Sequence, residues 1–178
     1  NPHEIFPGQK LIIPSRLLKG IPIDGLVTFI KGGVSIKLTE SEEWKDLQLN
    51  DKITQGNWIR TSPQGTIEIS FENDFSVLLR PNTTIEITSA RKKSAIYMMY
   101  KLFLDIGKTI SKIKKGTGKE TRYEIKTPSA VAAARGTEFR AGVDLEVTTR
   151  LEVLAGKVDV QAAKRAGIIH DVGKGLTH

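Results

Sequence analysis

Apolar and polar residues alternate along much of the chain, which is the pattern of β-strands with one buried face. The clearest stretch runs from Val143 to Val153 and predicts one continuous strand. Its expected core face consists of Val143, Leu145, Val147, Thr149, Leu151 and Val153. After Leu154-Ala155-Gly156-Lys157 the apolar parity changes to Val158 and Val160. A tight turn containing glycine would explain this change, so we expect a hairpin with a second antiparallel strand.

The same alternation occurs upstream. Ile67 to Phe71 and Phe75 to Leu79 flank the turn residues Glu72-Asn73-Asp74 and predict a second hairpin. Shorter strands are expected around Val34, Ile36 and Leu38, and around Ile85 and Ile87 after the break at Pro81-Asn82. Residues 96–104 also alternate but are apolar enough to form a helix; a strand is our preferred interpretation. Gly107 then begins a further stretch from Lys108 to Ile113.

Two segments do not fit this pattern. Glu40 to Leu47 is acidic and carries Trp44 and Leu47 at helical spacing, which predicts a single helical turn or an acidic loop. Thr127 to Gly136 has a capping Thr, a Pro at the first helical position, a run of Ala and a terminal Gly. On propensity alone this second segment would be a short helix.

The composition favours an all-β fold. Ile, Val and Thr are abundant, and short strands separated by Gly or Asn turns are typical of a sandwich, a barrel or a solenoid-like roll. We expect antiparallel strands and hairpins with at most one or two short helical turns. The chain has 178 residues and no cysteine, so its core must hold without disulfides. No apolar stretch is long enough for a transmembrane helix.

The net charge of +7 raises the possibility of an anionic partner. Basic residues gather near expected turns, and a possible basic rim consists of Arg91, Lys92, Lys93, Lys114 and Lys115. Such a rim could bind nucleic acid or anionic glycans, or only keep the protein soluble. Aromatic residues make up only 6% of the chain, and no expected strand carries paired stacking aromatics. Nucleic acid is therefore not the expected partner.

The sequence offers no catalytic constellation. The three histidines are His3, His170 and His178, and their spacing is not that of a zinc site or a catalytic triad. The carboxylates Glu40, Glu42, Glu43 and Asp46 lack the spacing of a calcium-binding loop and are the solvated charges of a loop. We expect no enzyme activity, no metal and no cofactor.

The first fourteen residues read Asn1-Pro2-His3-Glu4-Ile5-Phe6-Pro7-Gly8-Gln9-Lys10-Leu11-Ile12-Ile13-Pro14. This stretch resembles the C-terminal end of a LysM module, a family that binds glycans containing N-acetylglucosamine, chiefly peptidoglycan in bacteria. The resemblance implies possible glycan-binding positions at Asn1, Pro2, Ile5, Pro7 and Gly8. Since the chain begins at Asn1 rather than Met, we expect it to be a piece of a longer protein. Residues 15–24 would then be a linker.

Residues from about 25 to 175 resemble a FecR domain. The most specific matches are Ile125-Lys126-Thr127-Pro128-Ser129-Ala130, Arg135-Gly136-Thr137-Glu138-Phe139 and Leu154-Ala155-Gly156-Lys157-Val158. The family motif residues are Thr127, Pro128, Ala130, Arg135, Gly136, Thr137, Phe139, Gly156 and Val158. The resemblance implies strand rather than helix in the Ala-rich segment, and a FecR-like β domain over residues 25–178.

We expect structural roles for these motif residues. Small side chains let strands approach closely, Gly136 suits a bulge, and Phe139 fills a core. Arg135 would need a carboxylate or carbonyl partner if it were buried.

The two resemblances together imply a bacterial envelope or periplasmic protein. We expect a binding or sensing module, held on peptidoglycan by an upstream LysM, that engages an envelope protein at a strand edge or turn. Direct binding of peptidoglycan or anionic polysaccharide by the β domain is the alternative, and nucleic-acid binding through basic turns is a lower one.

Overall fold

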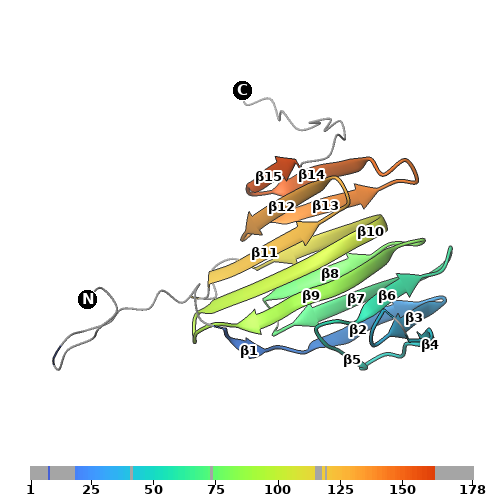
Figure 1. Ribbon diagram of the computed structural model, residues 1–178, viewed down its shortest axis with the longest axis horizontal. Helices are drawn as coiled ribbons and strands as arrows, with labels where there is room; N and C mark the ends of the chain where they lie inside the picture. The colour runs from blue at the N-terminus through green and yellow to red at the C-terminus, as the bar shows by residue number, and fades with distance from the viewer. Residues whose placement is uncertain are drawn as a thin grey trace, which may run out of the picture.

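The computed structural model describes residues 8, 19–40, 42–72, 74–114, 118 and 120–162. In these ranges the chain forms β-strands and turns, and contains no helix (Figure 1). The expected all-β fold class is therefore confirmed. Within the same residues there is accordingly no helix that is long and apolar enough to cross a membrane.

The described residues contain fifteen strands in chain order. They are β1 (Ile21–Pro22), β2 (Gly25–Lys31), β3 (Val34–Lys37), β4 (Lys45–Asp46), β5 (Lys52–Ile53), β6 (Trp58–Thr61), β7 (Thr66–Phe71), β8 (Phe75–Leu79), β9 (Thr84–Lys92), β10 (Tyr97–Ile113), β11 (Glu120–Lys126), β12 (Ala130–Arg135), β13 (Glu138–Val143), β14 (Thr149–Ala155) and β15 (Val158–Ala162). The first strand, β1, pairs with β9 and lies within the segment expected to be a linker.

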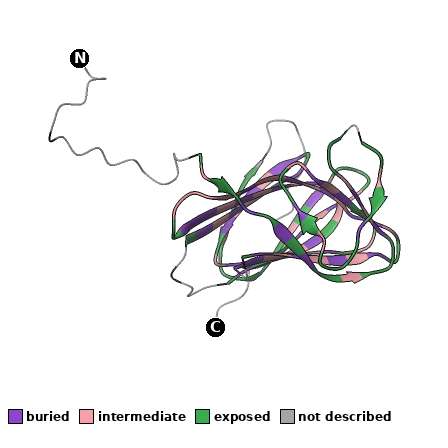
Figure 2. Ribbon diagram, turned by 90° about the horizontal axis from the view of Figure 1, so that it is seen from below, coloured by how far each residue is buried: buried purple, intermediate pink, exposed green. Residues whose placement is uncertain are grey.

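The strands form two layers that enclose one core (Figure 2). In layer A the order is β4-β3-β6-β9-β10-β11-β12-β15, and in layer B it is β5-β2-β7-β8-β10-β13-β14. Neighbouring strands are antiparallel except β10 and β11, which are parallel. Short segments carry the chain from one layer to the other, so the fold grows row by row from β2 to β15 (Figure 1).

Strand β10 is the element shared by both layers. Its first half pairs with β9 and β11 in layer A, and its second half pairs with β8 and β13 in layer B. The strand changes layer near Gly107, which has a φ of 102°. The Thr83 hydroxyl stabilises this bend, because it accepts a hydrogen bond of 2.9 Å from the N–H of Lys108, the residue after Gly107.

Inward-facing residues of both layers form the core, and aromatic rings run through its centre. The Phe75 ring lies 4.8 Å from the Tyr100 ring and 4.5 Å from the Tyr123 ring, measured between centroids. Tyr123 in turn lies 5.5 Å from Phe139. All four side chains are 0–1% exposed, so this row of rings bridges layers A and B.

Several expectations from the sequence are confirmed. β7 and β8 form the expected hairpin, with Phe71 opposite Phe75. Residues 97–104 are strand rather than helix, and Met98, Tyr100, Leu102 and Leu104 point into the core. The Ala-rich segment is strand β12, as the FecR resemblance implied and propensity alone did not.

Two expectations around residue 150 are wrong. Residues 143–153 are not one strand, because a turn at 144–148 separates β13 from β14 and the two strands pair with each other. Leu145 and Val147, expected in the core, are 88% and 48% exposed. β14 and β15 are not a hairpin either, since the turn at Gly156 takes the chain from layer B to layer A, where β15 pairs with β12.

The acidic segment is not a helical turn. Its described residues form a loop that contains the short strand β4, which pairs with β3. Trp44 and Trp58 both lie beside Lys37 on the outer side of layer A, with the Lys37 Nζ 5.2 and 5.3 Å from the two ring centroids. Arg60 stacks on Trp44 at 4.3 Å. Both tryptophans of the chain thus take part in cation–π contacts within the protein.

Candidate functional site at the open end of the roll

The last row of the roll is open. β14 pairs only with β13, and β15 pairs only with β12, so within the described residues one side of each strand has no neighbouring strand. We call β14, β15 and the 144–148 loop the open end; it lies at the top of Figure 1. Free strand edges present N–H and C=O groups that can pair with another chain.

The open end also exposes apolar side chains. Val153 and Val160 lie on the inward-facing side of their strands, opposite Phe139 and Ala132. They are nevertheless 46% and 43% exposed, because no further strand among the described residues covers them. Leu151 and Val158 are partly buried against the core. The exposed large apolar residues of the open end are Leu145, Val147, Val153, Leu154 and Val160. An apolar cluster beside free strand edges is typical of an interaction surface.

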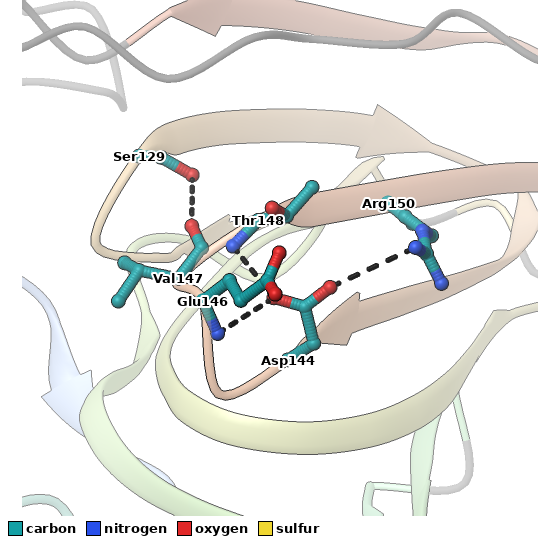
Figure 3. Close-up of polar contacts among 6 residues, drawn as sticks. All are labelled: Ser129, Asp144, Glu146, Val147, Thr148 and Arg150. Atoms are coloured by element: carbon teal, nitrogen blue, oxygen red, sulfur yellow. Dashed lines mark hydrogen bonds and ion pairs between the residues drawn. The ribbon is translucent and has the colours of Figure 1, made fainter.

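A network of polar contacts fixes the 144–148 loop (Figure 3). The Asp144 Oδ1 atom accepts hydrogen bonds from the Glu146 N–H at 3.1 Å and the Thr148 N–H at 2.9 Å. The other carboxylate oxygen lies 3.7 Å from the Arg150 guanidinium. Asp is favoured in turns because its side chain can bond backbone N–H groups in this way.

Val147 has an unusual backbone conformation in this loop. Its φ is 62°, a value that β-branched residues rarely adopt. The Val147 carbonyl accepts a hydrogen bond of 3.2 Å from the Ser129 hydroxyl, and its N–H donates to the Asp144 carbonyl at 3.0 Å. These bonds hold the loop in a form that exposes Leu145 and Val147. Strained backbone of this kind is often kept where a loop binds another molecule.

The first family motif lies where the two layers meet behind this loop. The Thr149 hydroxyl lies 2.7 Å from the Thr127 hydroxyl and 2.6 Å from that of Ser129. Thr127 also bonds the backbone N–H and C=O of Ala130 and so closes the β11–β12 turn. Pro128 is exposed at the tip of that turn. In this geometry Thr127 and Ala130 link layer A to the start of β14.

The second motif carries the chain from β12 in layer A to β13 in layer B. The Thr137 hydroxyl lies 2.9 Å from the carbonyl oxygens of both Arg135 and Lys157, so its single proton can be donated to either. Phe139 is fully buried, and Gly136 has a φ of 54°. Arg135 is 65% exposed and lies 3.2 Å from the Glu120 carboxylate. Arg135 therefore forms an exposed ion pair. Since it is not buried, it does not need the partner that a buried arginine would require.

The third motif makes the opposite change of layer. Gly156 has a φ of 92°, and a Cβ atom there would lie 2.9 Å from the Thr137 hydroxyl. Val158 then begins β15 opposite Ala134. The two layer changes are thus packed against each other through Thr137. These motif residues are recognisable in the sequence. The surface formed by the exposed Leu154 and Val160 is not, because it depends on which strands lie at the edges.

Four residues of the basic rim are described, and Lys115 lies outside the described residues. Arg91 bonds the Gly20 carbonyl, and Lys92 lies 3.9 Å from the Glu72 carboxylate. The Lys114 N–H donates to the Asp74 carbonyl, and both residues line a hollow of about 270 Å³. Lys92 and Lys114 thus lie beside the acidic Glu72 and Asp74.

The remaining candidate residues lie mostly outside the described ranges. Of the LysM positions, Asn1, Pro2, Ile5 and Pro7 are not described, and Gly8 is exposed. The three histidines are also outside the described residues. Among the residues that are described, no group of His, Asp or Glu could hold a metal ion. Burial raises the pKa of the Tyr123 phenol, so this hydroxyl stays protonated, and Ser111 donates a hydrogen bond to it.

A comparison with protein families matches residues 57–159 to the family described as FecR protein. The match covers more than half of the chain and includes all three motifs. The chain belongs to the FecR family. The FecR family is a non-enzymatic family of regulatory and sensing proteins, typically of the bacterial envelope.

A second comparison matches a much shorter stretch. Over 39 residues, which are 21% of this chain, the sequence is 54% identical to the ribonuclease Y of Wolinella succinogenes. The matched stretch is only 8% of that protein. No solved structure matches the chain.

Proposed function

We propose that this FecR-family chain is a non-catalytic binding and sensing module of the bacterial cell envelope. It is held on peptidoglycan by an upstream LysM module and engages a protein partner through the open end. The observation that carries this proposal is the combination of exposed Val153, Leu154 and Val160 with two strand edges that no other described strand covers. The LysM-like stretch from Asn1 to Pro14 supports the peptidoglycan tether.

The physical argument favours a protein over a glycan at this end. Strand addition satisfies unpaired backbone groups, and the apolar side chains between the two edges gain burial at the same time. Sugar-binding sites use stacking aromatic rings, whereas the open end has aliphatic residues and no exposed aromatic ring in its described part. A mixed-charge rim is likewise a poor match for nucleic acid, which requires a continuous positive surface.

Sedimentation with insoluble peptidoglycan separates the tether from the β domain. We would compare the 178-residue chain with the full-length gene product, each at low and high salt. The proposal predicts that only the full-length protein sediments at both salt concentrations. Salt-resistant sedimentation of the 178-residue chain would instead support direct glycan binding by the β domain. Sedimentation of that chain that disappears at high salt would indicate diffuse charge attraction alone.

A further inference from the structure

The open end is complementary to itself, and we propose that its partner is a second copy of this chain. The two copies join end to end, with β15 pairing with β15 and β14 with β14 in antiparallel fashion. A single two-fold axis perpendicular to the layers passes through Val160 and Leu151. This inference rests on the proposed function, because it names the protein that the open end engages.

Such an axis requires Val160 in layer A to lie over Leu151 in layer B, and contacts on each side place them so. On one side, Val158 belongs to the cross-strand row of Tyr123, which contacts Phe139 in the row of Val153. On the other side, Ala162 belongs to the row of Ala130 and Thr127, and the Thr127 hydroxyl bonds Thr149.

Val160 lies midway between Val158 and Ala162, and Leu151 lies midway between Val153 and Thr149. The two central residues therefore lie at the same level along the strands of the two layers. One axis can pass through both strands at these positions without shifting either layer.

On β14, the charged side chains favour a two-fold axis at Leu151. With the axis at Leu151, Arg150 of one copy lies opposite Glu152 of the other, and Leu151 lies opposite its own copy. These two charged side chains are 77% and 56% exposed and point away from the core. Moving the axis by one residue would place Arg150 opposite Arg150 or Glu152 opposite Glu152, and like charges directly opposite each other destabilise a sheet.

The residues of β15 are compatible with the matching axis position at Val160. An axis at Val160 places Asp159 opposite Gln161 of the other copy and joins the two Val160 side chains. An axis at Asp159 would bring two carboxylates together. The register that the charges favour on β14 is thus one that β15 accepts, and joining the edges there buries Leu151, Val153, Val158 and Val160 in a core that is continuous through both copies.

Single cysteine substitutions test this geometry, because the chain has no cysteine of its own. Residues on the axis lie directly opposite their own copies, at a Cα separation of about 5 Å that suits a disulfide. Under mild oxidation of the 178-residue chain, V160C and L151C are therefore expected to form disulfide-linked dimers. The unaltered chain should have twice its monomer mass by light scattering, and Val160→Lys should return it to a monomer.

Val158→Cys is the matched control. It is also an inward-facing valine of β15, but its copy would lie four residues along the strand, about 13 Å away. It should not cross-link to itself, and a V158C dimer would overturn the proposed axis. An unaltered chain that is monomeric would overturn the second copy as partner. If hydrogen exchange then finds the β14 and β15 amides protected, residues after Ala162 cover the edge instead.

A photo-cross-linker at Gln161, used in cells, distinguishes failure of this inference from failure of the proposed function. An adduct with twice the mass of the protein supports the second copy. A discrete adduct with a different envelope protein overturns the second copy but supports a protein-binding open end. If the cross-linker at Gln161 gives no more adduct than the cross-linker at the exposed control position Lys52, both the second copy and the protein-binding open end are contradicted.

Discussion

At the scale of single residues, three hydroxyls join the two layers behind the open end. Thr127, Ser129 and Thr149 are 1%, 8% and 6% exposed, and Thr149 contacts both of the others. Replacing Thr149 by Val keeps the shape but leaves two buried hydroxyls without this partner. We expect T149V to lower the free energy of unfolding by about 1–3 kcal/mol. Urea denaturation measures this loss.

The adjacent Thr148 provides the control for that substitution. It has the same side chain, is less buried, and contributes to the turn through its backbone N–H rather than its hydroxyl. We expect T148V to change the free energy of unfolding by less than about 0.5 kcal/mol. Equal losses in the two variants would mean that the hydroxyl network does not hold the layers together.

At the scale of elements, β10 depends on its bend at Gly107. A Cβ atom at this position would overlap the backbone and the hydroxyl of Thr83, and the positive φ also disfavours any other residue. We expect Gly107→Ala to lower the free energy of unfolding by at least about 2 kcal/mol, because the obstructing atoms include backbone that cannot move aside. Thermal unfolding followed by far-ultraviolet circular dichroism would show the loss.

Gly142→Ala is the matched substitution. Gly142 is on β13 and lies opposite Lys108 of β10. An added Cβ would lie 3.5 Å from the Lys108 side chain, an ordinary van der Waals contact. Stability should be unchanged or slightly raised, since alanine suits a strand interior better than glycine. A loss as large as that at Gly107 would show that any bulk near this bend is harmful.

The strands themselves could be predicted from the sequence, but two of their connections could not. Val143 and Thr149 are both inward-facing and lie six residues apart, so alternation continues unbroken through the intervening turn. Only Asp144, whose carboxylate bonds two N–H groups in the turn, was a local sign of it. At Gly156, a short turn suits a hairpin and a change of layer equally well. Which residues form the open end depends on these long-range pairings, so alternation alone could not locate it.

At the scale of the whole molecule, the chain adds rows of strands until the described part ends on an uncovered row. The core behind this row is complete, since Phe139 and Tyr123 are fully buried, whereas Val153 and Val160 in front of it are not. A structure that grows in this way is stabilised when its last row is covered. The stability of the molecule should therefore depend on whatever occupies the open end.

If the occupant is a second copy, folding and association are linked, and thermal stability must depend on protein concentration. A hundredfold rise in concentration should stabilise each copy by about 1.4 kcal/mol, which corresponds to a rise in Tm of about 3–6 °C. In V160K the added charges would lie opposite each other at the axis, so its Tm should not change with concentration. Differential scanning calorimetry of both proteins makes the comparison. A Tm of the unaltered chain that stays constant over this range would mean that the open end is not closed by another copy, since no monomer can respond to its own dilution.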